Sequence, residues 1–196
     1  MLPFFKMLII PFWVMTFVAI ACSKKANEVI PEPAMQYTNL GDVEIKAGQY
    51  QHIDIDGNGS NDFTFHTLLV GDPLLQRDRL QFLAGSKIGT NLLNNTFDES
   101  PRLTKGERIG LKHEGFTWYE ISSILLAEKL IPLHEDIYWD GIWKTANHHF
   151  LPVEVMKNGH AYLGWIELSF NKDTEKLILH KAAISTQADT EIKAGY

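Results

Sequence analysis

Five oxygen-bearing residues at alternate positions form the motif whose spacing is best suited to cation binding. They are Asp54, Asp56, Asn58, Ser60 and Asp62, in the run D-I-D-G-N-G-S-N-D. Ca²⁺ takes about 6–8 oxygen ligands, and a loop of this spacing supplies four side-chain oxygens and one main-chain carbonyl, that of Ser60. A central glycine, Gly59, stands where such a loop turns sharply. The sequence therefore predicts a calcium-binding loop.

The twelfth position of the loop excludes a helix-loop-helix calcium sensor. Phe65 stands where such a sensor carries a bidentate Glu. The motif resembles the calcium loop of FG-GAP repeats, D-x-D-G-D-G-x-x-D, with Asn58 in place of an Asp. A propeller needs about 4–8 blades, and the chain has one copy, so the resemblance implies a single structural calcium hairpin. The alternative is a metal-free turn, because Asp, Asn and Gly are ordinary turn residues.

Cys22, the only cysteine, follows a hydrophobic leader. Residues 1–21 carry one charge, Lys6, and end in Ala19-Ile20-Ala21. This pattern is typical of a bacterial lipoprotein signal, which would leave Cys22 as an acylated first residue. Ordinary signal peptidase cleavage after Ala21 is one alternative. A retained membrane anchor is the weaker one, because an apolar run of about 15 residues is shorter than the ~20 that a span needs.

The composition divides the chain into a leader (1–21), a tether (22–34) and one β domain (35–196). The tether holds two prolines and several charges, which cannot pack a core. Ser23 follows Cys22 where an Asp would signal inner-membrane retention, so we expect an outer-membrane protein whose partner is the membrane. The net charge of −6 argues against nucleic acid. With Cys22 acylated, disulfides and cysteine nucleophiles are excluded.

The hydrophobic pattern predicts a mainly β fold, an antiparallel β-sandwich-like single domain. Apolar runs at 149–156 and 161–170 flank Asn158-Gly159, the strongest short-range hairpin signal. Gly164 on the apolar stripe of the second run indicates close backbone approach or a bulge. Further strands are expected at 49–55, 63–70, 79–83 and 176–180.

One short α-helix is expected at about 117–130. Thr117 and Glu120 have the spacing of a capping box. Apolar residues then recur at helical spacing until Pro132; they are Ile121, Ile124, Leu125 and Leu130.

The order of motifs is similar to that of a group of uncharacterised secreted and lipid-anchored proteins of Gram-negative bacteria. The resemblance rests on the early D-x-D-G-N-G loop, the late Y-x-G-W-I strand at 162–166 and the closing I-K-A-G at 192–195. The usual late motif of the group is Y-G-W-I, and Leu163 interrupts it here. The resemblance implies a calcium-bearing β domain and no catalytic residues.

Two tryptophans suggest a ligand platform. Trp139 and Trp143 flank Asp140-Gly141, and exposed Trp rings could stack on sugars; the alternative is that they fill the core. His113-Glu114, His134-Glu135-Asp136 and His148-His149 lack the spacing of a metal-binding pair and are expected to be structural or solvated.

Together these features predict a lipid-anchored envelope protein with a structural Ca²⁺ loop and a non-catalytic structural or binding role, its partner a glycan or an envelope protein. The first alternative is a glycan-binding module that uses Trp139 and Trp143. The second is a hydrolase whose site has no recognisable motif, because catalytic groups that converge in space need not be close in sequence.

Overall fold

The computed structural model describes residues 33–196. The predictions for the leader, for Cys22 and for most of the tether lie outside the described residues. No helix among the described residues is long and apolar enough to cross a membrane.

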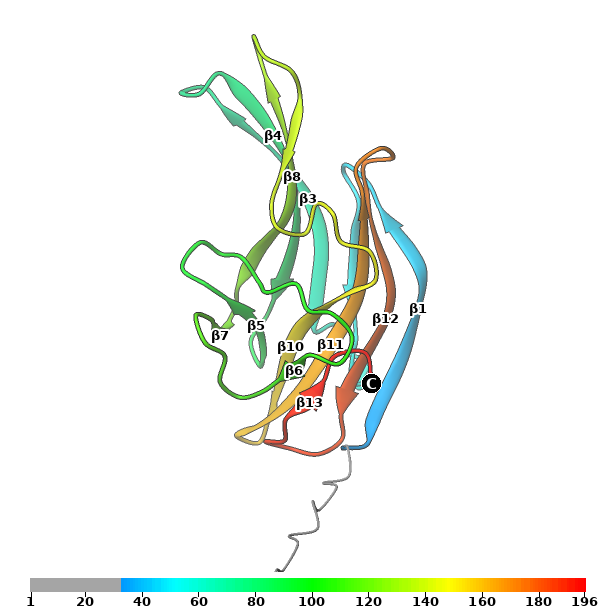
Figure 1. Cartoon of the computed structure of the whole chain (residues 1–196). Helices are drawn as coiled ribbons and strands as arrows, with labels where there is room; N and C mark the ends of the chain where they lie inside the picture. Colours follow the sequence, from blue (N-terminus) through cyan, green and yellow to red (C-terminus); the bar gives the residue numbers. More distant parts are fainter. Residues whose placement is uncertain (1–32) are drawn as a thin grey trace, which may run out of the picture. The chain divides into compact units, whose positions relative to one another are not determined.

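The described chain consists of β-strands joined by turns and loops (Figure 1). The strands in chain order are β1 (Met35–Ile45), β2 (Tyr50–Ile53), β3 (Phe63–Asp72), β4 (Arg77–Ser86), β5 (Thr90–Asn94), β6 (Arg108–Ile109), β7 (Thr117–Glu120), β8 (Ser123–Pro132), β9 (Tyr138–Asp140), β10 (His149–Lys157), β11 (His160–Asn171), β12 (Lys176–Ser185) and β13 (Ile192–Lys193). The predicted mainly β, sandwich-like fold is confirmed.

Three antiparallel sheets share these strands. A six-stranded sheet has the order β1-β12-β11-β10-β5-β7, and a five-stranded sheet has the order β2-β3-β4-β8-β9. The short strands β6 and β13 pair with each other. The Asn158-Gly159 hairpin is confirmed: Lys157 pairs with His160, and both turn residues have positive φ, as the preferred two-residue hairpin turn requires.

The main core lies between the two larger sheets, and each contributes the apolar residues of one face. The five-stranded sheet supplies Phe63, Phe65 and Phe82, and the six-stranded sheet supplies Ile166, Leu168 and Leu179, all buried. Strand residues two apart share a face, so the odd positions of β11 point the other way. There a second cluster forms around Trp165, covered by Ile109 of β6 and Ile192 of β13. The strand β11 is therefore buried on both faces.

The predicted helix at 117–130 is wrong, because these residues form β7 and most of β8. Ile121, with a φ of 52°, lies between the two strands. The carboxylate of Glu120 caps nothing at Thr117 and instead accepts the Gly89 N–H at 2.6 Å. Ile124 pairs with Ala84 and is buried in the main core, whereas Leu130, beyond a shift in the pairing of β4 with β8, pairs with Arg79 and is buried outside that core.

Gly164 makes the close backbone approach that the sequence predicts. It pairs with Ile184 of β12 and Val153 of β10. A Cβ at Gly164 would lie 2.6 Å from the carbonyl oxygen of Ala183 and 3.3 Å from the Cα of Ile184. Both atoms belong to the backbone, which cannot move aside as a side chain can.

Gly164→Ala should therefore destabilise the domain through overpacking, by about 1–3 kcal/mol. Gly71→Ala is the matched control, because its Cβ would meet only the Asp78 side chain at 3.6 Å, an ordinary contact. Urea unfolding curves measure both changes. An equal loss of stability in the two variants would contradict the close approach at Gly164.

Candidate metal centre

The acidic loop connects β2 to β3, and backbone pairing of the two strands closes the base of the loop. Ile53 pairs with Phe63, and the Asp62 amide donates to the Ile53 carbonyl at 2.7 Å. Asp54 directly follows β2 and Asp62 directly precedes β3, so the pairing of these strand ends brings the two residues together. Ile55, inside the loop, is fully buried in the main core, so the loop is fixed to the domain at its own base.

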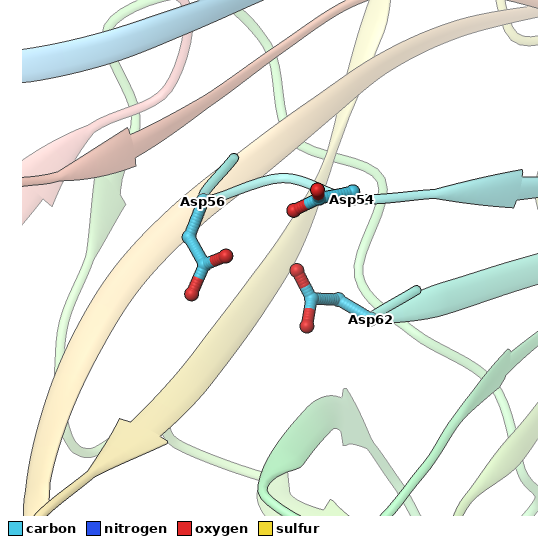
Figure 2. Close-up of side chains that lie close together, drawn as sticks. All are labelled: Asp54, Asp56 and Asp62. Atoms are coloured by element: carbon cyan, nitrogen blue, oxygen red, sulfur yellow. The ribbon is translucent and has the colours of Figure 1, made fainter. Parts of the chain in front are cut away.

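Three carboxylates of the loop converge. One oxygen from each of Asp54, Asp56 and Asp62 lies within 4.8 Å of the others. Figure 2 shows the three side chains pointing toward a common centre, with Asp54 and Asp62 arriving from the two strand ends. Carboxylate oxygens are the ligands of hard cations. The cluster could hold a metal ion.

Backbone amides hold the carboxylates in place. The Asn58 amide donates to Asp54 Oδ1 and to Asp56 Oδ1, each at 3.1 Å, and the Gly59 amide donates to Asp54 Oδ2 at 2.7 Å. Gly57 and Gly59 have φ values of 69° and 83°. Glycine adopts this left-handed region without steric cost, which lets the loop turn its N–H groups inward.

Asp62 is buried as a whole residue, with 4% of its surface exposed, and the Asp56 side chain is also buried, with 1% exposed. Burial raises the pKa of Asp62, the Ile55 N–H partly offsets this, and the nearby charges of Asp56 and Asp54 raise the pKa further. Asp62 Oδ2 accepts that N–H at 3.0 Å. The ionised carboxylate therefore lacks enough positive charge around it.

Two lysines from the rest of the domain supply part of that charge. Lys157 at the end of β10 places its ammonium 2.9 Å from Asp56 Oδ2, and Lys87 lies 4.0 Å from Asp62 Oδ1. Burial opposes ionisation of Asp56, but the hydrogen bonds from Lys157 and Asn58 outweigh it and lower the pKa of Asp56. Neither lysine is marked by the local sequence, because contact with the loop depends on the tertiary fold.

The side chains of the other two predicted ligand residues, Asn58 and Ser60, make hydrogen bonds of their own. Asn58 Oδ1 accepts the Ser60 amide at 2.7 Å, and Asn58 Nδ2 donates to Asp56 at 2.9 Å. Ser60 Oγ accepts from Lys87 at 3.0 Å. A cavity of about 340 Å³ adjoins the loop. Its lining includes Asp56, Asn58, Ser60 and Asp62 from the loop, and Lys87 and Lys157 from outside it.

The predicted tryptophan platform is wrong for Trp143, because its side chain has no exposed surface. Its indole N–H donates to the Ser100 carbonyl at 3.0 Å, so the ring is a satisfied core residue. Trp139 packs against the same core, edge-on to Phe170 with ring centroids 5.1 Å apart. Large aromatic side chains bury the most apolar area per residue, which favours packing of these tryptophans in the core over exposure to a ligand.

The histidine-containing motifs do not form a shared metal site. His113 lies in a short bridge to Phe116, and His134 is exposed. His148 contacts Glu167 at 2.8 Å, whereas His149 contacts the backbone of Asn147. Among the described residues, the three aspartates form the only cluster of His, Cys, Asp or Glu whose ligand atoms converge.

Comparisons with known proteins assign no family to this chain: no protein-family model, no curated protein and no solved structure matches it.

The opposite pKa shifts of Asp62 and Asp56 give opposite predictions in EDTA. A raised pKa means that the stability of the folded state falls as pH rises from the ordinary Asp range through the raised value. Asp62→Asn removes this cost and should raise the melting temperature at pH ~7. A lowered pKa stabilises the folded state above the ordinary Asp range. Asp56→Asn should therefore lower the melting temperature.

Thermal melting between about pH 3 and pH 7 measures both effects. We expect the melting temperature to rise in Asp62→Asn and to fall in Asp56→Asn at neutral pH. The wild-type advantage over Asp56→Asn should disappear on acidification, while the disadvantage relative to Asp62→Asn should also shrink. Two variants with shifts of the same sign would refute the electrostatic assignment.

Proposed function

We propose that this protein is a lipid-anchored component of the bacterial envelope whose β domain is stapled by one Ca²⁺ ion in the Asp54–Asp62 loop. The observation that carries the proposal is the convergence of three carboxylates, one of them from the buried Asp62, in the loop of a hairpin. An ordinary turn needs no such convergence, and its acidic side chains gain by separating into water.

The donor set favours calcium over other metals. All the candidate ligands are oxygens, whereas zinc sites are built from Cys and His with few carboxylates. Mg²⁺ demands near-ideal octahedral geometry and keeps most of its water, while Ca²⁺ accepts irregular sets of carboxylates, amide oxygens and carbonyls. Asp54, Asp56 and Asp62 would be joined by Asn58 Oδ1 after rotation of its side chain and by the Ser60 carbonyl.

The role of the ion would be structural. The loop carries Ile55 and leads directly into Phe63, and both residues are buried in the main core. A dication at the cluster would relieve the repulsion among three carboxylates and fix the two strand ends. Lys87 and Lys157 already neutralise part of the cluster, so we expect the weak affinity of extracellular modules, a Kd of about 10⁻⁴–10⁻³ M.

Calcium should raise the melting temperature of the protein relative to EDTA. At about 10 mM Ca²⁺ and the expected Kd, mass action predicts a stabilisation of about 1.4–2.7 kcal/mol. The variant Asp54→Asn/Asp56→Asn should lose this gain, and Mg²⁺ at the same concentration should give less of it.

Asp173→Asn is the control for this experiment, because Asp173 is an exposed acidic residue in the β11–β12 turn. It should retain the full calcium response. A calcium response that survives in the double variant would refute the assignment of the ion to this loop, and a wild-type protein without any response would reduce the loop to a turn.

The anchor has a separate test. Acyl chains on Cys22 would contribute about 0.8 kcal/mol for each buried CH₂ group and hold the protein on the membrane. Expressed in a Gram-negative host, the wild type should partition into the detergent-rich phase, and Cys22→Ser should move to the aqueous phase. Ser23→Ala should behave as the wild type. Membrane association of Cys22→Ser unchanged from the wild type would contradict lipidation.

A further inference from the structure

Ser169, His180 and Asp42 form a continuous hydrogen-bonded chain on the six-stranded sheet, away from the metal loop. Ser169 Oγ lies 2.8 Å from His180 Nε2, and His180 Nδ1 lies 2.6 Å from Asp42 Oδ1. Ser169 shares its face of β11 with Trp165, so it points away from the main core. The three residues come from β11, β12 and β1, which are neighbours in the sheet.

Two adjacent irregularities of the sheet create this arrangement. In β12, His180 is the extra residue where the pairing with β11 shifts between Glu167 and Leu168. In β1, the pairing with β12 shifts between Asn39 and Val43, and Asp42 lies in that interval with a φ of 54°. Bulges re-aim side chains and are frequent beside active sites. A regular ladder would not bring Asp42 and His180 together in this way.

The partners determine where the protons lie. Asp42 is a carboxylate and only accepts, so His180 Nδ1 carries the hydrogen and donates it. His180 Nε2 is then an acceptor and receives the Ser169 hydroxyl hydrogen. Ser169 Oγ in turn accepts the backbone N–H of His148 at 2.9 Å. The serine hydroxyl is therefore polarised toward a base whose tautomer is fixed, which is the arrangement that nucleophilic catalysis by serine requires.

The neighbouring His148 argues against a metal site at this cluster. Its ring stacks on His180 with centroids 4.2 Å apart and planes 21° apart, and its Nδ1 lies 2.8 Å from Glu167. Imidazole lone pairs lie in the ring plane, so nearly parallel stacked rings cannot direct them at one ion. The cluster is thus unsuited to a metal that both histidines would bind.

We propose that Ser169 is the nucleophile and His180 the general base of a site that hydrolyses esters of short acyl groups, with Asp42 as the positioning residue. Ser169 Oγ attacks the ester carbonyl and its proton passes to His180 Nε2. The proton then goes to the departing alcohol as the C–O bond breaks, leaving an acyl-serine. Water, deprotonated by His180, releases the carboxylic acid and restores the serine.

The burial of the site sets the substrate class. Ser169 is 8% exposed and the His180 side chain 14%. The low exposure of the hydroxyl favours a small acyl group such as acetyl over long acyl chains, whereas the Asp42 side chain is 77% exposed. The proposed esterase site supplies residues for the hydrolase alternative, and the proposal does not depend on the metal loop.

The test is 4-nitrophenyl acetate hydrolysis by the full chain in detergent micelles. We expect release of nitrophenolate and a single acetyl adduct that peptide mass mapping places on Ser169. Ser169→Ala should lose about 100-fold or more in rate, because it removes the nucleophile that forms the acyl-serine. Ser185→Ala, which removes a buried serine hydroxyl of β12, is the matched control and should keep the wild-type rate. An adduct elsewhere, or a wild-type rate in Ser169→Ala, would overturn the proposal.

A second variant keeps the proposal testable if Ser169→Ala fails to fold. Ser169→Cys preserves the hydrogen-bonding position, and a thiol beside His180 should react with iodoacetamide at least about 10-fold faster than the thiol of Ser185→Cys, because the imidazole favours the thiolate. Peptide mapping separates each thiol from Cys22. Equal alkylation rates would overturn the assignment of His180 as base.

Asp42 acts through His180, so its test needs a readout that a structural role would not change. Asp42→Asn should slow acylation about 10-fold or more and shift the His180 tautomer seen in ¹⁵N NMR spectra, with the melting temperature unchanged. An unchanged rate and tautomer would remove Asp42 from the site.

Discussion

The burial of β11 on both faces is the constraint on which the rest of the domain depends. One face closes the main core against the five-stranded sheet, and the other carries the Trp165 cluster beneath β6 and β13. A strand covered on both sides admits almost no polar residue without a partner. Gly164 is part of the same constraint, because β12 approaches it too closely for any side chain. Ser169, near the end of this strand, is a polar residue whose hydroxyl has its partners.

Sequence reasoning predicted the features of this domain that are encoded locally. The Asn158-Gly159 turn and the alternating β11 pattern each depend on residues close in the chain, and both were found. The same holds for the acidic loop, since the two strand ends that bring Asp54 and Asp62 together are adjacent in sequence. Local signals suffice where a short hairpin positions the chemistry.

Features that depend on distant pairing could not be predicted. The helix expected at 117–130 was wrong because pairing with β4 holds these residues in a strand, where Ile124 lies opposite Ala84. The sequence left open whether Trp143 lies in a surface platform or in the core; it is buried, and its indole N–H donates to the distant Ser100 carbonyl. Asp42 and His180 are far apart in the chain, and only two aligned irregularities in sheet pairing bring them together.

The ion pair between Lys157 and Asp56 has a mechanical meaning for the domain. Lys157 belongs to the six-stranded sheet, whereas Asp56 lies in a loop of the five-stranded sheet. Their ion pair therefore links the two sheets. A dication in the loop would compete with the lysine ammonium for the same carboxylate. Binding of the dication would then replace an ion pair between the two sheets by metal contacts within one hairpin. The hairpin would stiffen while the two layers gained freedom to slide at that edge.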